Sequence, residues 1–243
     1  VAALAYGTES IPAVYKIFGP SNQYVTAAKQ LVSEEGVGID LPAGPSEVLV
    51  IADDSASAEF VAADLLSQAE HGTDSQVVLL SDSEALVDQI LTELQVQLKD
   101  LPRKEIAEVA LSKSRALVLK DMQEALDFSN QYAPEHLIIS THNDEEMASR
   151  VNNAGSVFLG PYSPESVGDY ASGTNHTLPT EGFAKVFSGV SLDSFVKKIT
   201  FQRLSKEGIM NIGQAVELMA EAEGLQGHKN AVSVRLAQIK SGN

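Results

Sequence analysis

Between Glu47 and Gly160, short runs of apolar and β-branched residues alternate with longer stretches that have helical spacing. The short runs predict five strands, at Glu47–Ala52, Gln76–Ser81, Arg115–Lys120, His136–Thr141 and Ser156–Gly160. The longer stretches predict helices near Ala56–Glu70, Ser83–Lys99, Lys104–Ser112, Met122–Tyr132 and Asp144–Asn152. This alternation is typical of an α/β fold with a parallel sheet covered by helices on both faces, here an incomplete Rossmann-like sheet. Such sheets hold their sites in loops beyond the carboxyl ends of the strands, so we expect the site at that edge.

Smaller units flank this region on both sides. Before it, the pattern predicts part of a smaller α/β domain, with strands Tyr15–Phe18 and Gly38–Leu41 around a helix at Tyr24–Glu34. After it, the pattern predicts a helical tail with helices at Ser191–Lys198, Lys206–Glu223 and Lys229–Lys240. We therefore expect three parts: residues 1–45, an α/β catalytic domain at 46–190, and a tail at 191–243.

The chain begins without a methionine. Val1–Gly7 reads as the last turns of a helix already under way. We therefore expect the chain to be a fragment of a longer polypeptide.

Composition narrows the classes of function. The 243 residues suffice for a real core, and a net charge of −16 argues against nucleic acid or an anionic membrane as a partner. The sequence has no cysteine, so any zinc site must use His, Asp, Glu or carbonyl oxygen, which favours a catalytic site over a structural one. No run of eighteen apolar residues and no signal-peptide pattern is present, which predicts a cytoplasmic location.

The first candidate site lies at the end of the helix predicted near Ala56–Glu70. Gln68 and His71 are three residues apart, so on a helix their side chains are neighbours and could share a metal. Gly72 is expected to stop the helix, which places His71 in its last turn. The alternative is a histidine that simply favours the negative end of a helix.

The second candidate is the pair Glu135 and His136. Pro134 cannot continue the preceding helix, so both residues lie in the turn that enters the next strand. A histidine that titrates near neutrality, beside a carboxylate, could take a proton from an alcohol and activate a water molecule. The alternative is a capping glutamate next to a half-buried histidine.

Two further segments carry polar groups. The segment Pro161–His176 is rich in Gly, Pro and Ser and contains Asp169 and His176; a loop of this length in a compact domain is usually functional, and disorder is the alternative. In the tail, two glycines flank a turn at Glu223–His228. Taken alone, His228 reads as a surface or N-cap residue.

No nucleotide fingerprint is present. The turn Gly19-Pro20-Ser21-Asn22 opens a helix whose free amides could meet a phosphate, but there is no Rossmann or P-loop glycine pattern. Spacing alone therefore does not predict NAD.

Together these segments resemble histidinol dehydrogenase. The resemblance is carried by IFGPSNQYVTAAK (17–29), DLPAGPSEVLVIAD (40–53), DLLSQAEHGTDSQVVLL (64–80), YAPEHL (132–137), GPYSPESVGDYASGTNHTLPT (160–180) and EGLQGH (223–228). Order and spacing are kept to about Gln238. The resemblance covers only the later part of the family's chain, whose N-terminal region has no counterpart here.

The resemblance implies an activity and a set of roles. The family oxidises L-histidinol through histidinal to L-histidine, the last steps of histidine biosynthesis, with NAD⁺ as oxidant and a zinc ion that does no redox chemistry. His136 resembles the general base, Glu135 resembles the residue that activates water, and Asn22 corresponds to a nucleotide contact. The implied zinc ligands are Gln68, His71, Asp169 and His228. The implied substrate contacts are Ser46, Gln68, His71, His136, Asp169, His176, Glu223 and His228.

The family forms a homodimer that exchanges its tails, so the resemblance implies that Glu223 and His228 reach the partner's site. Ser21 stands where the family usually has glycine, and its side chain could hinder a phosphate. Thr73 stands where the family commonly has a proline after the His-Gly pair. Two other interpretations remain: a zinc hydrolase on a similar fold, in which Glu135 activates a metal-bound water, and a catalytically inactive fragment that folds and dimerises.

Overall fold

The computed structural model describes residues 1–19 and 22–242. They form two compact units, Val1–Phe195 and Val196–Asn243. Each unit is described by itself. The predicted boundary between residues 1–45 and 46–190 stays a prediction.

The first unit is built around a five-stranded sheet. Its strands are β3 (Glu47–Ala52), β4 (Gln76–Ser81), β5 (Arg115–Val118), β6 (His136–Ser140) and β7 (Ser156–Leu159). They lie in the order β5-β4-β3-β6-β7, and every neighbouring pair is parallel. The predicted parallel sheet is confirmed. Because β3 is central, the chain crosses from one half of the sheet to the other between β5 and β6.

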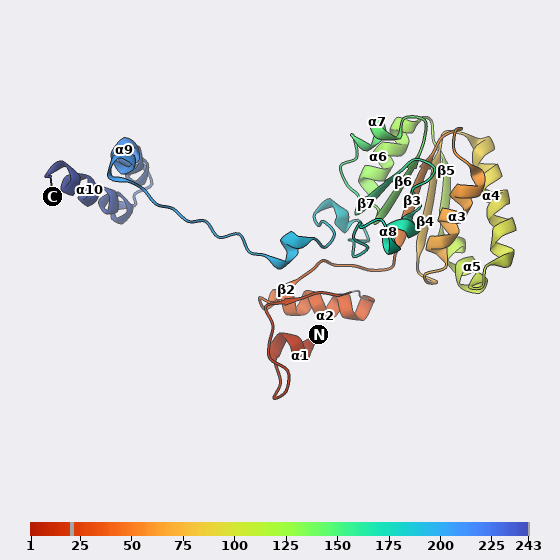
Figure 1. Cartoon of the computed structure of the whole chain (residues 1–243), viewed down its shortest axis with the longest axis horizontal. Coiled ribbons are helices and arrows are strands. Elements are labelled where there is room, and N and C mark those ends of the chain that lie inside the picture. The colour runs from red at the N-terminus through yellow and green to blue at the C-terminus, as the bar shows by residue number, and fades with distance from the viewer. Residues whose placement is uncertain (20–21, 243) are drawn as a thin grey trace. The chain divides into compact units, whose positions relative to one another are not determined.

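Alternate residues of each strand enter two separate cores, as the pleat of a strand requires. Val48 and Val50 belong to one core and Leu49 and Ile51 to the other. Helices cover both faces of the sheet (Figure 1). The first core is closed by α3 (Ala58–Ala69), α4 (Glu84–Gln97) and α5 (Lys104–Lys113), and the second by α6 (Met122–Tyr132) and α7 (Asp144–Ala148).

Local signals fix where these helices begin and end. Ser57, Ser83 and Asp121 cap α3, α4 and α6 by accepting a backbone N–H with their side chains. At its other end α6 stops at Ala133, which adopts a left-handed conformation with φ 58°. This turn releases the chain before Pro134 and leads it directly into β6.

Several predicted boundaries are wrong. A short 3-10 helix, η1 (Leu98–Asp100), follows α4, and α7 ends at Ala148 rather than at Asn152. The segment predicted as the loop Pro161–His176 contains a helix, α8 (Glu165–Tyr170), which rests on β7: a Cβ at Gly168 would meet the Phe158 ring at 2.6 Å. Because this segment contains an ordered helix, the structure does not support the alternative that it is disordered.

The tail also differs from its prediction. The helix expected at Ser191–Lys198 is only a four-residue 3-10 turn, η3 (Leu192–Phe195), preceded by η2 (Phe183–Lys185). The residues that would extend it, Val196, Lys197 and Lys198, are exposed, so no packing of an apolar face supports a helix.

The second unit is a helical hairpin of α9 (Lys206–Ala222) and α10 (Gln226–Lys240). Gly224, with φ 72°, makes the turn. The helices approach closely, since a Cβ at Gly213 would meet Leu236 Cδ1 at 2.9 Å. α10 begins three residues before the predicted start at Lys229. Among the described residues, no helix is both long and apolar enough to span a membrane.

The first residues of unit one form a small α/β element. It contains α1 (Ala2–Tyr6), α2 (Gln23–Glu34) and the parallel pair β1 (Lys16–Ile17) and β2 (Gly38–Ile39). The Lys29 and Asp40 side chains, 3% and 1% exposed, form an ion pair at 2.8 Å. Gly19 is bonded to both, because its carbonyl accepts from Lys29 Nζ and its N–H donates to Asp40 Oδ2. The pair therefore fixes the backbone of Gly19.

Removing the lysine should leave a buried carboxylate without its partner. We expect Lys29→Met to lower the free energy of unfolding by about 3–5 kcal/mol, measured by urea denaturation. The control is Lys104→Met: Lys104 pairs at 3.6 Å with Glu108, but both side chains are about half exposed. This change should cost less than about 1 kcal/mol. Equal losses in the two variants would contradict a structural role for the buried pair.

Candidate active site

A cavity of about 210 Å³ collects most of the residues that the sequence singled out. Its lining includes Ser46, Gln68, His71, Glu135, His136, Asp169 and His176. These residues come from the starts of β3 and β6, the end of α3, α8 and the segment after α8. Residues more than a hundred positions apart in the sequence therefore face one cavity.

This cavity lies at the amino edge of the sheet, so the expectation of a site at the carboxyl edge is wrong. Parallel pairing places Val48 opposite His136, which brings the entries of β3 and β6 together. α3 follows β3 and leads back to the entry of β4, so its last turn reaches the same edge. The rule for open α/β sheets fails here because the polar groups precede the strands instead of following them.

Gln68 and His71 meet at the cavity by a different route from the predicted one. α3 ends at Ala69 with Glu70 as its cap, so His71 lies beyond the helix, and Gly72 lacks the positive φ of a helix stop. The His71 N–H donates to the Gln68 carbonyl at 3.2 Å. The turn thus keeps the two side chains on one side of the chain.

Gln68 is the clearest sign that the cavity takes a ligand. Its side chain is completely buried, and neither Oε1 nor Nε2 has a hydrogen-bond partner among the described residues. A buried amide left in this state costs about 1–3 kcal/mol for each unsatisfied group. A ligand that accepts the lone pair of Oε1 would recover part of this cost.

Three more donors line the same cavity. Ligand atoms of His71, Glu165 and Asp169 all lie within 4.8 Å of one another. Imidazole nitrogen with carboxylate and amide oxygen is a donor set that suits a divalent ion such as Zn²⁺. The residues present therefore fit a metal ion.

The sequence analysis missed Glu165. It is 2% exposed, and its Oε2 has no partner among the described residues. Burial, together with the nearby charges of Asp169 and Asp64, raises the pKa of Glu165 to about 8. The only signal in the sequence was an acidic residue after Pro164, a common surface pattern at a helix start.

His136 is arranged as a neutral base. Its Nδ1 lies 3.0 Å from the Glu47 carbonyl, which as an acceptor requires the proton on Nδ1 and leaves Nε2 with a free lone pair. Nε2 is buried without a partner among the described residues. Burial lowers the pKa of His136, so the imidazole is neutral near pH 7. The side chain is buried, not half-buried as the alternative supposed.

Glu135 lies beside His136, among other acidic side chains. Its Oε2 accepts the Glu47 N–H at 2.9 Å, so Glu135 is not a helix cap. Burial raises the pKa of Glu135 to about 9, and the charges of Glu47, Glu165 and Asp169 add to the shift. Without a cation nearby this carboxyl group is protonated at neutral pH.

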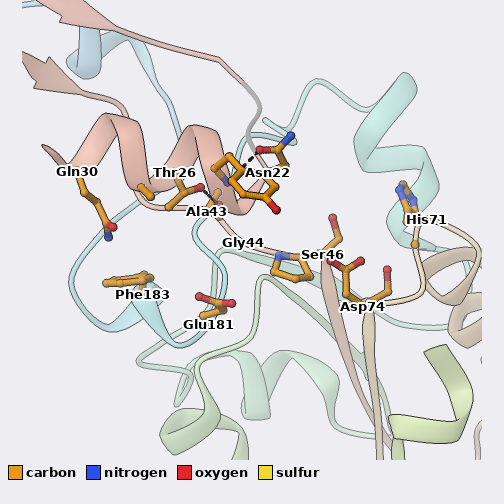
Figure 2. A pocket seen from close by; sticks show the side chains of 15 residues that line it. Asn22, Thr26, Gln30, Ala43, Gly44, Ser46, His71, Asp74, Glu181 and Phe183 are labelled. Atoms are coloured by element: carbon orange, nitrogen blue, oxygen red, sulfur yellow. Dashed lines mark hydrogen bonds between the residues drawn. The ribbon is translucent and has the colours of Figure 1, made fainter. Parts of the chain in front are cut away.

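A second, larger cavity of about 730 Å³ shares Ser46 and His71 with the first. In Figure 2, Asn22, Thr26 and Gln30 project from α2, while Glu181 and Phe183 face them across the cavity. The Asn22 side chain caps α2 by accepting the N–H groups of Tyr24 and Val25. These amides are therefore occupied, which weakens the idea that they hold a phosphate. Ser21 lies outside the described residues.

Glu223 and His228 belong to the second unit. Glu223 caps the end of α9, and His228 is the third residue of α10, whose N-cap is Leu225. The N-cap interpretation of His228 is therefore wrong. Both side chains are exposed.

The carboxyl edge of the sheet has its own polar group of Asp53, Asp54 and His142. There Asp53 accepts the His142 N–H at 2.9 Å and lies 3.1 Å from its Nδ1, and it also bonds Ser55. The Asp53 and His142 side chains thus form a hydrogen bond with each other.

The parallel sheet, with its buried cavity of imidazole and carboxyl groups, is typical of α/β enzymes. A model of the histidinol dehydrogenase family matches residues 1–236. The chain belongs to this family. It spans about half the length of the curated relatives it matches.

Individual relatives agree. Histidinol dehydrogenase from Bacteroides fragilis is 63% identical over 240 residues, which is 99% of this chain and 56% of that protein. The chloroplastic histidinol dehydrogenase of Arabidopsis thaliana is 58% identical, with 99% of this chain and 52% of that protein covered. The crystal structure of histidinol dehydrogenase from Elizabethkingia anophelis matches with a TM-score of 0.96 and 61% identity, over 98% of this chain and 55% of that one.

The raised pKa of Glu135 predicts a pH-dependent stability. A carboxyl group whose pKa is higher in the folded state favours folding when protonated, so this contribution is lost as pH rises from about 4.5 through about 9. With chelator present, the free energy of unfolding should fall over this range. In Glu135→Gln the fall should be smaller by a few kcal/mol, on the order of the linkage energy of such a shift.

The control is Glu145→Gln on the exposed start of α7, which should follow the wild-type curve. Urea unfolding at pH 5, 7 and 9 measures all three proteins. Parallel curves for wild type and Glu135→Gln would contradict the buried, protonated state of Glu135.

Proposed function

We propose that the full-length protein, of the length of the curated relatives, is a zinc-dependent histidinol dehydrogenase. It would oxidise L-histidinol through histidinal to L-histidine, the last steps of histidine biosynthesis, with NAD⁺ as hydride acceptor. The observation that carries the proposal is the single cavity that holds Gln68, His71, Glu135, His136 and Asp169 together, with the Gln68 amide unsatisfied. The relatives are histidinol dehydrogenases, which supports the choice of substrate.

The zinc ion would be held by Gln68, His71 and Asp169 of this chain, with His228 as a further ligand. When bound, it supplies a positive charge that orients and polarises the substrate, and it does no redox chemistry. The proximity of the His71 and Asp169 donor atoms, and the unsatisfied Gln68 amide, support this set.

In the first oxidation, His136 takes the proton of the substrate hydroxyl group. Its neutral imidazole, fixed through Nδ1 by the Glu47 carbonyl, presents Nε2 to the cavity. The hydride leaves the carbinol carbon for NAD⁺, and the C–O bond becomes the double bond of histidinal. Loss of one proton and one hydride balances the step.

In the second oxidation, Glu135 takes a proton from the water molecule that adds to the aldehyde carbon. The hydrated aldehyde then loses its hydride to another NAD⁺ and its second proton to solvent, and the carboxylate of histidine remains. Glu135 must be ionised for this step. Its high pKa therefore requires positive charge among the acidic groups of the cavity.

The remaining contacts follow from the two cavities. Ser46 and His176 line the smaller cavity and would bind histidinol, together with Glu223 and His228. Asn22 lines the larger cavity, which joins the first through Ser46 and His71 and has the size for part of a nucleotide.

We further propose a homodimer that exchanges its tails. In the second unit, large apolar side chains are exposed, among them Phe201 at 92%, Leu218 at 60% and Met219 at 65%. Apolar surface of this kind marks an interface. Glu223 and His228 would then complete the site of the partner subunit. The cytoplasmic location stays part of the proposal.

The other two interpretations have less support. A zinc hydrolase would need the same donors but no nicotinamide, and the family match extends over residues 1–236 rather than over the site alone. The isolated chain could still be inactive, because it spans only about half the length of its relatives.

The role of His136 gives the direct test of the proposed activity. In the zinc-loaded full-length protein, His136→Ala should lower kcat for NADH formation from histidinol by about 10²–10⁴, the usual contribution of a general base. The control is His142→Ala at the opposite edge of the sheet, which should leave kcat unchanged. An unchanged rate in His136→Ala would rule out this base, and turnover without NAD⁺ would favour a hydrolase.

Tail exchange predicts complementation between two inactive variants. Full-length His136→Ala and His228→Ala, coexpressed, should form mixed dimers in which one of the two sites has both histidines. We expect about a quarter of the wild-type specific activity, since half of the dimers are mixed and each has one intact site. No recovery, with mixed dimers verified by mass spectrometry, would show that each site is made from one chain.

A further inference from the structure

Glu47, the first residue of β3, contacts both catalytic candidates through its backbone. Its N–H donates to Glu135 Oε2 at 2.9 Å, and its carbonyl lies 3.0 Å from His136 Nδ1. The parallel register holds these groups side by side, because Val48 is paired with His136. A single residue thus orients the carboxyl group and the imidazole.

The Glu47 side chain reaches a different part of the chain. It is 3% exposed, and its Oε1 accepts the Glu181 N–H at 2.8 Å. Glu181 has a φ of 54°, a left-handed conformation that a residue with a side chain adopts only at a cost of about 1–2 kcal/mol. The bond from Glu47 therefore holds the backbone in a conformation that it would otherwise leave.

A second hydrogen bond joins the same two segments. Gly44 N–H donates to Oγ1 of Thr180, which is 1% exposed. Residues 44–47 and 180–181 are therefore fastened at two points.

The fastened segment forms one wall of the smaller cavity. His176, Leu178 and Thr180 all line it. Leu178 packs close to Glu135: a Cβ placed on Gly155 would meet the Glu135 carbonyl at 2.5 Å and Leu178 Cβ at 3.1 Å. A shift of this wall would expose the Glu135–His136 pair to water and displace His176.

We propose that the Glu47 carboxylate is a positioning residue that fastens the wall formed by residues 176–181 over Glu135 and His136. The proposal rests on the proposed function, because it assigns Glu47 a part in the same reaction. Glu47 touches neither substrate nor nucleotide; it acts through the groups that do.

The electrostatics agree with this role. Burial raises the pKa of Glu47 to about 7, while the hydrogen bond from the Glu181 N–H favours the ionised form. Its Oε2 has no partner among the described residues, so Oε1 carries the contact to the wall. An amide oxygen in the same place could accept the same N–H.

The test compares Glu47→Ala with Glu47→Gln in the zinc-loaded full-length protein. Glu47→Ala should lower kcat for histidinol by about 10–100-fold, the scale of a misplaced catalytic group. Glu47→Gln keeps an acceptor for Glu181 and should recover kcat to within about fivefold of wild type. Zinc content, measured by mass spectrometry, should stay equal in all three proteins.

Glu124→Ala is the matched control. Glu124 Oε2 also accepts one backbone N–H, that of Lys120, at 2.8 Å, but at an exposed helix start away from the cavity. This variant should keep kcat. A purely structural effect of Glu47 would instead lower the folded fraction and leave kcat per zinc-bound site unchanged, which would overturn the proposal.

Hydrogen–deuterium exchange tests the fastening without any turnover. The amide of Glu181 should exchange at least about tenfold faster in Glu47→Ala and at the wild-type rate in Glu47→Gln. If the wild-type protein makes no NADH, the proposed function fails while this exchange still reports the bond. Equal exchange in wild type and Glu47→Ala would overturn the fastening itself.

Discussion

A set of carboxyl groups buried at the amino edge of a parallel sheet is the constraint on which this molecule depends. Glu47, Glu135 and Glu165 are each at most 5% exposed, and burial raises their pKa values to about 7, 9 and 8. The carboxyl end of α3 points to the same edge and adds the negative end of a helix dipole. Such a site is unfavourable when empty of cations and favourable for a divalent ion.

The fold produces this concentration of charge by register. Parallel pairing of Val48 with His136 places the first residues of β3 and β6 next to one another. The left-handed turn at Ala133 ends α6, so Glu135 lies at the start of β6. The last turn of α3 lies at this same edge of the sheet. The apolar residues of β3 and β6 fill the cores on both faces, so the polar groups are confined to the strand ends. The same arrangement makes Glu47 the common anchor of Glu135 and His136.

Much of the architecture could be predicted from the sequence because strong, local patterns determine it. The apolar runs of β3, β4 and β6 and the caps at Ser57, Ser83 and Asp121 identify the sheet and its helices within a few residues. The candidate residues Gln68, His71, Glu135 and His136 all line one cavity, and their roles stay predictions. The edge of the sheet at which the cavity lies was predicted wrongly. The general rule for α/β folds places a site after the strands, whereas these polar groups precede their strands.

The missed features depend on contacts distant in sequence. Glu165 and Glu47 resemble ordinary acidic residues at element starts, and only the tertiary structure shows that they are buried. The helix predicted at Ser191–Lys198 did not form beyond one turn, because its residues have little to pack against within the first unit. α3 ends at Ala69, one residue before the predicted end at Glu70, and Gly72 does not adopt the left-handed conformation that its type suggests.

Anomalous diffraction at the zinc edge from crystals of the full-length protein tests the central claim most directly. The account predicts one strong zinc peak at about 2.0–2.2 Å from the Gln68 amide oxygen, a His71 nitrogen and an Asp169 oxygen. Such a peak would satisfy the buried amide and neutralise the acidic edge. An empty cavity in zinc-saturated crystals, or a peak instead at Asp53 and His142 on the opposite edge, would contradict it.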